Sequence, residues 1–361
     1  MSKIIIAGLP IGGLSSGEAT SRLTRSIRAC WPALPSEHIV QLPLADGGEG
    51  TIDLLVTQSL GSFLEVEATS ATGEPVVVPL GFAGEDGKLA IIEMQRVARS
   101  NEQRGTSYGV GELILDALDE GAFSVLLGHD EPLAGDAGLG AAAALGVKFF
   151  DSSGHELNMK DPASALSQVA RIDATGRAFE ILSSRFYIAR SAKTLGTLPS
   201  EELRTELLRL SEIIRRDTGI PVSTEHLSAS AVEFGLIAFC GAEVRDGMSL
   251  VIEATGVETM MKRGEIGTFI LIAESPQAIS ADAVKNVLES ASTSGARIIL
   301  IVSHNPTAAE KKKLPARVTI RSLADARLFA APIGVDAAMD AIRRDTLLRI
   351  EKIAPELGIT E

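Results

Sequence analysis

The sequence predicts an α/β protein with two domains: a doubly wound parallel-sheet (Rossmann-like) domain built from both chain ends, and an inserted α+β domain. Three observations predict this. The chain has 361 residues, which is long for one hydrophobic core. Short apolar runs alternate with amphipathic segments near both ends, as in βα units. From residue 63 the apolar residues alternate instead, which indicates strands with one exposed face. We therefore expect residues 1–62 and 242–361 in the first domain and residues 63–241 in the second.

The first βα unit is the clearest. Ile4-Ile5-Ile6 is a β-branched run followed by Gly8, as in a buried parallel strand. Ser15 and Glu18 have the spacing of a capping box, which predicts the start of a helix. A second strand leads into Pro43, so the chain opens as β–α–β. The apolar face of the first helix comprises Ala19, Leu23, Ile27 and Cys30.

The later elements show either the alternating apolar pattern of strands or the three-to-four-residue apolar spacing of helices. Residues 63–68 and 76–82 alternate as strands do, and Asp86-Gly87 predicts a hairpin turn. Gly121 ends a helix expected over residues 109–120, and a long helix is expected between Ser200 and Gly219. The other predicted elements are strands at 123–127, 268–272, 298–302 and 318–320 and helices at 228–239, 281–291 and 336–353.

Composition narrows the class of protein. A formal net charge of −13 argues against nucleic-acid and anionic-membrane partners, which require a basic face. No apolar run approaches the roughly 20 residues that span a bilayer. The N-terminus reads as a strand rather than a signal peptide. Cys30 and Cys240 are far apart in apolar surroundings, as buried thiols of a cytosolic protein are. We therefore expect a cytoplasmic protein.

The stretch most suggestive of chemistry is Asp46-Gly47-Gly48-Glu49-Gly50, between a strand and a helix. Glycines let the backbone adopt positive φ and approach a ligand closely. The two carboxylates suit a cation, a hydroxyl-bearing substrate or a metal–phosphate complex. The alternative is an ordinary βα turn in which Asp46 or Glu49 caps the helix.

This stretch also carries a family resemblance. Residues 43–51 (PLADGGEGT) closely resemble a signature of the bacterial glycerate kinases, ATP-dependent enzymes that phosphorylate D-glycerate. Further matches follow in the same order and cover nearly the whole chain. They are residues 72–76, 91–94, 106–114, 144–151 and 238–245.

The resemblance implies a set of site residues and one site between the domains. It implies catalytic roles for Asp46, Glu49 and Glu93. It implies ligand binding by Gly47, Gly48, Thr51, Met94, Thr106, Tyr108, Asp136, Gly138 and Glu274. We expect the carboxylates of Asp46, Glu49, Glu93 and Asp136 to face one cleft.

Several motifs that would serve a triphosphate are altered. Residues 8–13 lack the acid and the lysine of the family's first loop. Asp130-Glu131-Pro132 replaces a Gly-Gly-Ser, and proline lacks an N–H while two acids repel phosphate. Glu233 stands in the expected glycine cluster, and a late Gly-Lys motif is absent. The Cys-Asp-Val and Gly-Pro-Gln-Lys-Gly motifs expected between residues 166 and 219 are also missing.

Three interpretations remain open. The favoured one is a relative that binds a small hydroxy acid such as glycerate but has lost ATP phosphotransfer, or acts as a regulatory or complex-forming subunit. The second is an active, divergent kinase, which alone would require ATP and Mg²⁺. The third is an enzyme of different chemistry built on His129, Asp130 and Glu131, and the same three residues with Asp136 are candidate ligands of a metal. Homo-oligomerisation is open, as is the identity of any other cofactor.

Overall fold

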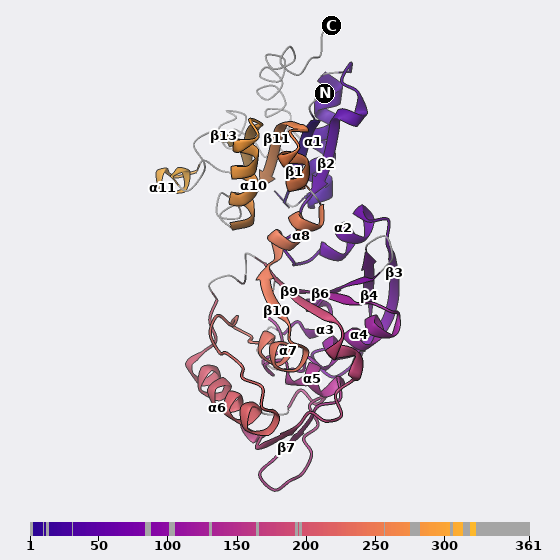
Figure 1. Cartoon of the computed structure of the whole chain (residues 1–361), viewed down its shortest axis with the longest axis vertical. Coiled ribbons are helices and arrows are strands. Elements are labelled where there is room, and N and C mark those ends of the chain that lie inside the picture. The colour runs from indigo at the N-terminus through magenta and orange to yellow at the C-terminus, as the bar shows by residue number, and fades with distance from the viewer. Residues whose placement is uncertain are drawn as a thin grey trace, which may run out of the picture. The chain divides into compact units, whose positions relative to one another are not determined.

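The computed structural model divides into two compact units (Figure 1). Residues 1–45 with 248–361 form the terminal unit, and residues 46–247 form the central unit. The structure describes residues 3–9, 11, 14–30, 32–83, 88–100, 105–129, 132–163, 166–191, 194, 197–255, 257–274, 282–303, 306–312 and 318–322. The predicted Asp86-Gly87 turn and the predicted helix 336–353 lie outside these residues.

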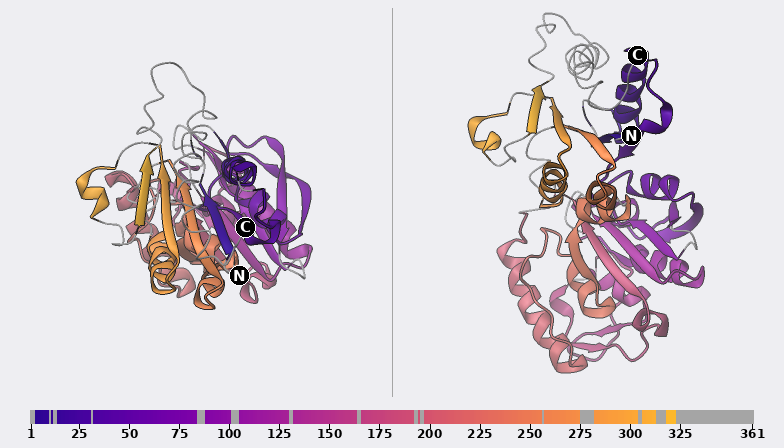
Figure 2. Two further views of the ribbon diagram at one scale, coloured as in Figure 1. Left: turned by 90° about the horizontal axis from the view of Figure 1, so that it is seen from above. Right: turned by 45° about the horizontal axis from the view of Figure 1, so that its top comes forward.

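The terminal unit contains a five-stranded sheet in the order β13-β12-β11-β1-β2, with all neighbours parallel. Figure 2 shows the indigo N-terminal strand beside the orange strands from the other end of the chain. In the register, Ile5 pairs with Val40 on one side and with Phe269 on the other. The predicted strands are thereby confirmed. Their bounds are β1 Lys3–Gly8, β2 Ile39–Pro43, β11 Ile266–Ala273, β12 Arg297–Val302 and β13 Val318–Ser322.

The first helix of this unit begins as predicted. The backbone N–H of Ser15 donates to Glu18 Oε2 at 2.9 Å, and the N–H of Glu18 donates to Ser15 Oγ at 3.2 Å. Leu23 and Ile27 pack with the sheet isoleucines in one apolar core. The helices here are α1 Ser16–Cys30, α8 Gly247–Thr255, α9 Val257–Lys262, α10 Asp282–Thr293 and α11 Ala308–Lys311, with a 3-10 turn at Ser36–His38.

The central unit contains a six-stranded sheet in the order β10-β9-β6-β5-β4-β3. Strands β5, β6, β9 and β10 run parallel, and β3 and β4 are antiparallel additions at one edge. The alternating segments therefore form the antiparallel strands expected of them. The bounds are β3 Ser62–Thr69, β4 Pro75–Ala83, β5 Leu89–Glu93, β6 Ser124–His129, β9 Arg185–Arg190 and β10 Glu243–Asp246.

The long helix α6, Glu201–Thr218, has the predicted ends. Ser200 Oγ accepts from the N–H of Leu203 at 3.2 Å, and Gly219 adopts a φ of 75°. Helix α7 begins later than predicted, because Ala231 adopts a φ of 54° just before it. Cys240 is a buried free thiol at its end, as expected. The helices of this unit are α2 Thr51–Gln58, α3 Gln95–Ala98, α4 Tyr108–Asp119, α5 Leu139–Ala144, α6 and α7 Glu233–Cys240. A hairpin of β7 Lys148–Phe150 and β8 Arg171–Asp173 and the 3-10 turns Leu166–Gln168 and Phe179–Leu182 complete it.

Helix α2 packs in the central unit, although the sequence assigned residues 46–62 to the terminal domain. A Cβ atom on Gly81 of β4 would lie 2.8 Å from Cγ2 of both Ile52 and Val56. Because Gly81 has no side chain, helix α2 can pack directly against strand β4. The expected domain limits, 1–62 with 242–361 and 63–241, stay a prediction. Within the described residues, no helix has the length and apolarity needed to cross a membrane.

Helix α2 ends with a leucine where glycine is usual. Leu60 adopts a φ of 53°, and the N–H of Gly61 donates to the carbonyl of Val56 at 2.8 Å, as in a Schellman motif. Leu60 is 94% exposed, so its side chain contributes little packing. The left-handed conformation costs an ordinary L-residue about 1–2 kcal/mol, and asparagine tolerates it better.

We expect Leu60→Asn to raise the free energy of unfolding by about 0.5–1 kcal/mol, because that strain is relieved. Urea unfolding followed by circular dichroism measures the change. Leu208→Asn is the matched control, since Leu208 is an exposed leucine within α6 and has no such strain. A variant no more stable than the wild type would contradict the assignment of strain to Leu60.

Candidate functional site

Polar residues gather where the parallel strands of the central sheet end. Glu93 ends β5, His129 ends β6, Arg190 ends β9 and Asp246 ends β10. The register pairs Arg190 with both His129 and Asp246. Ligands of open α/β sheets bind outside the carboxyl ends of the strands. We call the four residues the strand-end edge.

The loop of residues 46–50 lies across this edge. A Cβ on Gly47 would lie 2.3 Å from the carbonyl oxygen of Ala189, and one on Gly128 would lie 2.2 Å from that of Gly47. Gly47 also has a φ of 95°. Any side chain at residue 47 would therefore displace the loop from β6 and β9. Gly47, predicted to bind ligand, is required first of all for this close backbone contact.

The carboxylates of the loop differ in their surroundings. Asp46 is half-buried, and its Oδ1 accepts from the N–H of Gly48 at 3.4 Å. Glu49 is exposed. Thr51 is buried and donates its hydroxyl to the carbonyl of Gly48 at 2.7 Å. Gly50 is the N-cap of α2 with a φ of 89°, and no side chain of the N-cap residue bonds the helix. Neither Asp46 nor Glu49 is thus the N-cap residue that the alternative required.

Glu93 fastens the start of α2 to β5. Its carboxylate is buried, with Oε1 accepting from the N–H of Ile52 at 3.1 Å and Oε2 accepting from Arg96 Nε at 2.7 Å. Burial raises the pKa of Glu93 above its usual value, and the Ile52 bond and the Arg96 charge oppose that rise. Glu93 therefore positions the loop. Met94 beside it is buried in the sheet core.

A second cluster of predicted residues surrounds Asp136. Asp136 Oδ2 accepts from the N–H and hydroxyl of Ser107 at 2.7 and 2.9 Å and from the N–H of Gly140 at 3.1 Å. Its Oδ1 accepts from the N–H of Gly138 at 3.0 Å. Burial raises the pKa of Asp136, and these hydrogen bonds oppose the rise. One carboxylate thus joins the starts of α4 and α5.

Thr106, Tyr108 and Gly138 belong to the same cluster. Thr106 Oγ1 donates to the carbonyl of Met159 at 2.7 Å and accepts from the N–H of Tyr108 at 3.0 Å. A Cβ on Gly138 would lie 2.2 Å from the carbonyl oxygen of Val232, before α7. A Cβ on Gly235 would lie 2.3 Å from the carbonyl oxygen of Gly138. These glycines serve the packing of α5 on α7.

A buried ionic cluster is the feature that the sequence did not reveal. Arg190 Nη2 donates to Glu233 Oε1 at 2.8 Å, and Ser228 Oγ donates to Glu233 Oε2 at 2.8 Å. His129 Nε2 lies 3.1 Å from Ser228 Oγ and 3.6 Å from Glu233 Oε1. Glu233 is fully buried and Arg190 nearly so. A buried carboxylate requires such a partner, and the charge of Glu233 was the available signal.

The predicted site residues thus fall into separate sets. Asp46, Gly47, Gly48, Glu49 and Thr51 lie in or next to the loop that Glu93 holds, whereas Asp136 bonds the starts of α4 and α5. Glu274 follows β11 in the terminal unit. Asp130 and Glu131 lie outside the described residues. The shared cleft and the catalytic and binding roles stay predictions.

No metal site emerges from the residues that the structure describes. Within those ranges, no group of three or more His, Cys, Asp or Glu side chains is arranged to hold an ion. Of the candidate metal ligands, His129 faces Ser228 and Glu233, and Asp136 bonds the starts of α4 and α5. The interpretation as an enzyme built on His129, Asp130 and Glu131 stays a prediction.

Comparison with known proteins gives consistent matches. The sequence model of the glycerate kinase family matches residues 11–195. A glycerate kinase of Bacillus subtilis (strain 168) is 28% identical over 280 residues, which cover 70% of this chain and 72% of that protein. A glycerate 2-kinase of Escherichia coli (strain K12) is 28% identical over 272 residues, covering 68% and 70%. A crystal structure described as glycerate kinase 2 from Salmonella typhimurium LT2 has a TM-score of 0.74 at 24% identity, covering 98% and 99% of the two chains. That structure shows the shared α/β fold.

Proposed function

The chain belongs to the glycerate kinase family, and from this premise we propose that it binds a small hydroxy acid such as glycerate and has lost most or all ATP phosphotransfer. The binding half of the proposal is supported by the loop of residues 46–50. Its glycines fit the backbone of β6 and β9, and Glu93 holds the helix that follows. Asp46 and Glu49 are there to accept hydrogen bonds from substrate hydroxyls.

One observation supports the loss of phosphotransfer: Arg190 at the strand-end edge and Arg96, which follows β5, are both paired with buried carboxylates. Arg190 is bonded to Glu233, and Arg96 is bonded to Glu93. A transferring phosphoryl group needs positive charge that is available to it. The charge of each arginine is already balanced by a buried carboxylate, so it supplies little net positive charge to a phosphoryl group, and leaving that partner is costly.

The residues described here do not fit a triphosphate well. The family's phosphate loop would use backbone N–H groups at the start of α5. In this chain the N–H groups of Gly138 and Gly140 donate to Asp136. Pro132 in the same connection has no N–H to offer.

An active, divergent kinase is the second candidate. The observation that favours it is that curated relatives similar to most of this chain are named glycerate kinases. Those names describe the relatives. The loop of residues 46–50, which resembles the signature of the glycerate kinase family, is present in this chain. Binding of ATP–Mg²⁺ with affinity comparable to that for glycerate would favour this candidate over the first. A cytoplasmic location is a further part of the proposal, and homo-oligomerisation stays open.

Binding of D-glycerate provides the direct test. We expect D-glycerate to stabilise the protein in a thermal-shift assay, by roughly 2.7 kcal/mol near 100 times its dissociation constant. We expect ATP–Mg²⁺ to give no shift. Asp46→Asn should weaken glycerate binding about tenfold or more, because a charged acceptor contributes roughly 1.5–3 kcal/mol.

Asp53→Asn is the matched control for this test. Asp53 is an exposed aspartate of α2, outside the loop, so its loss should leave the affinity unchanged. Equal weakening in both variants would point to general loss of negative charge rather than to the loop. The absence of any D-glycerate binding to the wild type would overturn the proposed function.

A further inference from the structure

A pocket of about 410 Å³ opens beside the ends of β9 and β10. Its volume lies in the range of roughly 300–1,000 Å³ that is typical of small-molecule sites. All of its lining residues belong to the central unit. They combine an apolar wall with charged groups of both signs: Leu227, Ile237, Ala242 and Val244 with Arg190, Glu225, His226, Arg245 and Asp246.

Arg190 places a guanidinium in the lining of this pocket. The residue is 9% exposed. Its Nη2 donates to Glu233, whereas its buried Nε has no hydrogen-bond partner among the described residues. A guanidinium carries five N–H donors in a fixed fork. The Arg190 side chain keeps 11% of its surface exposed and lines the pocket, so a bound acceptor can meet that exposed part.

The pocket adjoins the loop of residues 46–50. A Cβ on Gly47 would clash with the backbone of Ala189, the neighbour of Arg190. A Cβ on Gly247 would lie 1.9 Å from the carbonyl oxygen of Asp46, and Gly247 follows the lining residue Asp246. The pocket is therefore continuous along the backbone with the site of the proposed function. His226, which adopts a φ of 61°, also lines the pocket.

We propose that this pocket binds the carboxylate of a polyhydroxy acid longer than glycerate, with Arg190 receiving the carboxylate. The inference rests on the proposed function, which it deepens by naming the substrate class. Arg190 suits a planar carboxylate. Glu225 and Asp246 line the same pocket and accept hydrogen bonds from hydroxyl groups. The volume exceeds what a three-carbon acid fills, so a six-carbon sugar acid such as gluconate fits the space better.

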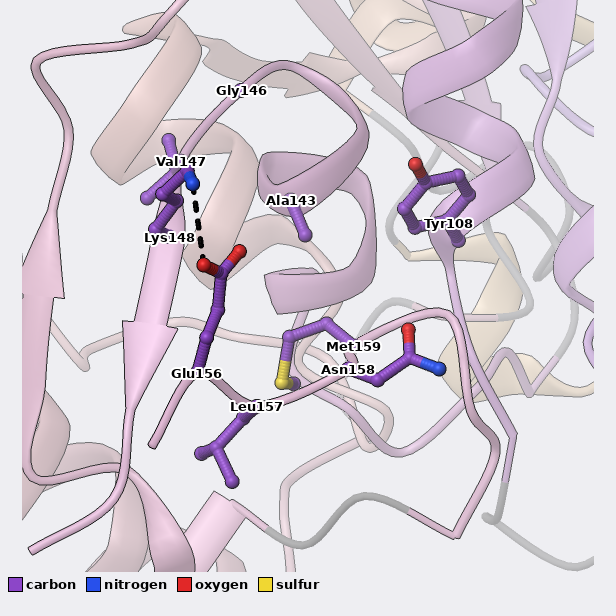
Figure 3. A pocket seen from close by; sticks show the side chains of 9 residues that line it. All are labelled: Tyr108, Ala143, Gly146, Val147, Lys148, Glu156, Leu157, Asn158 and Met159. Carbon is purple, nitrogen blue, oxygen red and sulfur yellow. Dashed lines mark hydrogen bonds and ion pairs between the residues drawn. The ribbon is translucent and has the colours of Figure 1, made fainter. Parts of the chain in front are cut away.

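A second pocket of the central unit lacks these features (Figure 3). It lies between α5 and the β7 hairpin and includes Tyr108, Lys148 and Glu156. Figure 3 shows the ion pair between Lys148 and Glu156 in its lining, and the Lys148 Nζ and Glu156 Oε2 atoms lie 3.2 Å apart. Both of these side chains are about half exposed to solvent. Because Lys148 is solvated and paired with Glu156, this pocket offers less to a bound anion. It is therefore a suitable control.

Isothermal titration calorimetry on the full chain tests the inference. The probes are D-gluconate, D-glycerate, hexanoate as an acid without hydroxyls, and inorganic phosphate. We expect gluconate to bind more tightly than glycerate, and hexanoate and phosphate to give no binding. The double variant Arg190→Gln with Glu233→Gln removes both charges together and leaves no buried ion unpaired. It should weaken gluconate binding about tenfold or more, equivalent to about 1.4 kcal/mol.

Two further variants keep the test decisive. Lys148→Gln, in the control pocket, should leave gluconate affinity unchanged. Asp246→Asn should weaken it, and this half-buried residue can be tested even if the double variant does not fold. Gluconate binding that is unaffected by both pocket variants but lost in Asp46→Asn would overturn the inference while the proposed function stands. Tight phosphate binding would show that the pocket is a simple anion site and would overturn the inference of a hydroxy-acid ligand. No binding of either hydroxy acid would overturn both.

Discussion

Glu233→Ala is expected to lower the free energy of unfolding by about 3–5 kcal/mol. The substitution leaves Arg190 buried without its carboxylate and removes the acceptor of the Ser228 hydroxyl. Removal of one partner from a buried pair is much more costly than removal of both, because the remaining charge stays desolvated. Urea unfolding followed by circular dichroism measures the loss, and a reduced yield of folded protein would accompany it.

The paired variant separates the ion pair from side-chain packing. Arg190→Gln with Glu233→Gln should cost far less than Glu233→Ala, since no unpaired charge remains. The double-mutant cycle, completed by each single glutamine variant, gives the coupling energy between the two residues. Single and double changes that simply add would show that the pair contributes nothing beyond its packing.

ATP-dependent phosphorylation of D-glycerate is expected to be absent or very weak. Loss of one charge-stabilising donor commonly costs 10²–10³ in rate, about 2.7–4 kcal/mol. Here Arg190 and Arg96 are bonded to buried carboxylates, and the N–H groups at the start of α5 are bonded to Asp136. Even with strong non-additivity, little catalysis should remain.

A coupled assay for ADP release, with D-glycerate and ATP–Mg²⁺, measures this activity. The glycerate kinase of Bacillus subtilis is the positive control, because it is similar over most of this chain. Turnover near 1 s⁻¹ or faster, the lower end of typical enzymes, would support the active-kinase candidate instead. In that event Arg96→Ala tests whether Arg96 supplies the missing charge.

Helices and strands that are marked by local sequence patterns could be predicted from the sequence. The capping box of Ser15 and Glu18 and the ends of α6 at Ser200 and Gly219 formed as expected, because each depends on residues only a few positions apart. The parallel strands at both chain ends also formed, since apolar β-branched runs of that length have few alternatives in a βα unit.

The contacts of the candidate site could not be predicted in the same way. Glu93 caps α2 from 41 residues away, and Arg190 meets Glu233 across 43 residues. Such pairs depend on strand order and on where each helix begins, which local patterns do not determine. Family resemblance brought Glu93 into the predicted site. It could not reveal Arg190, which belongs to none of the matched motifs.

The contact between Asp46 and Gly247 has a consequence for how this protein can be taken apart. The central unit is one continuous segment, and its first residue lies against its last. A segment whose ends meet can be excised, transplanted or circularly permuted with a short linker. Such a graft would carry the loop, the strand-end edge and the Arg190 pocket together, separated from Glu274 of the terminal unit.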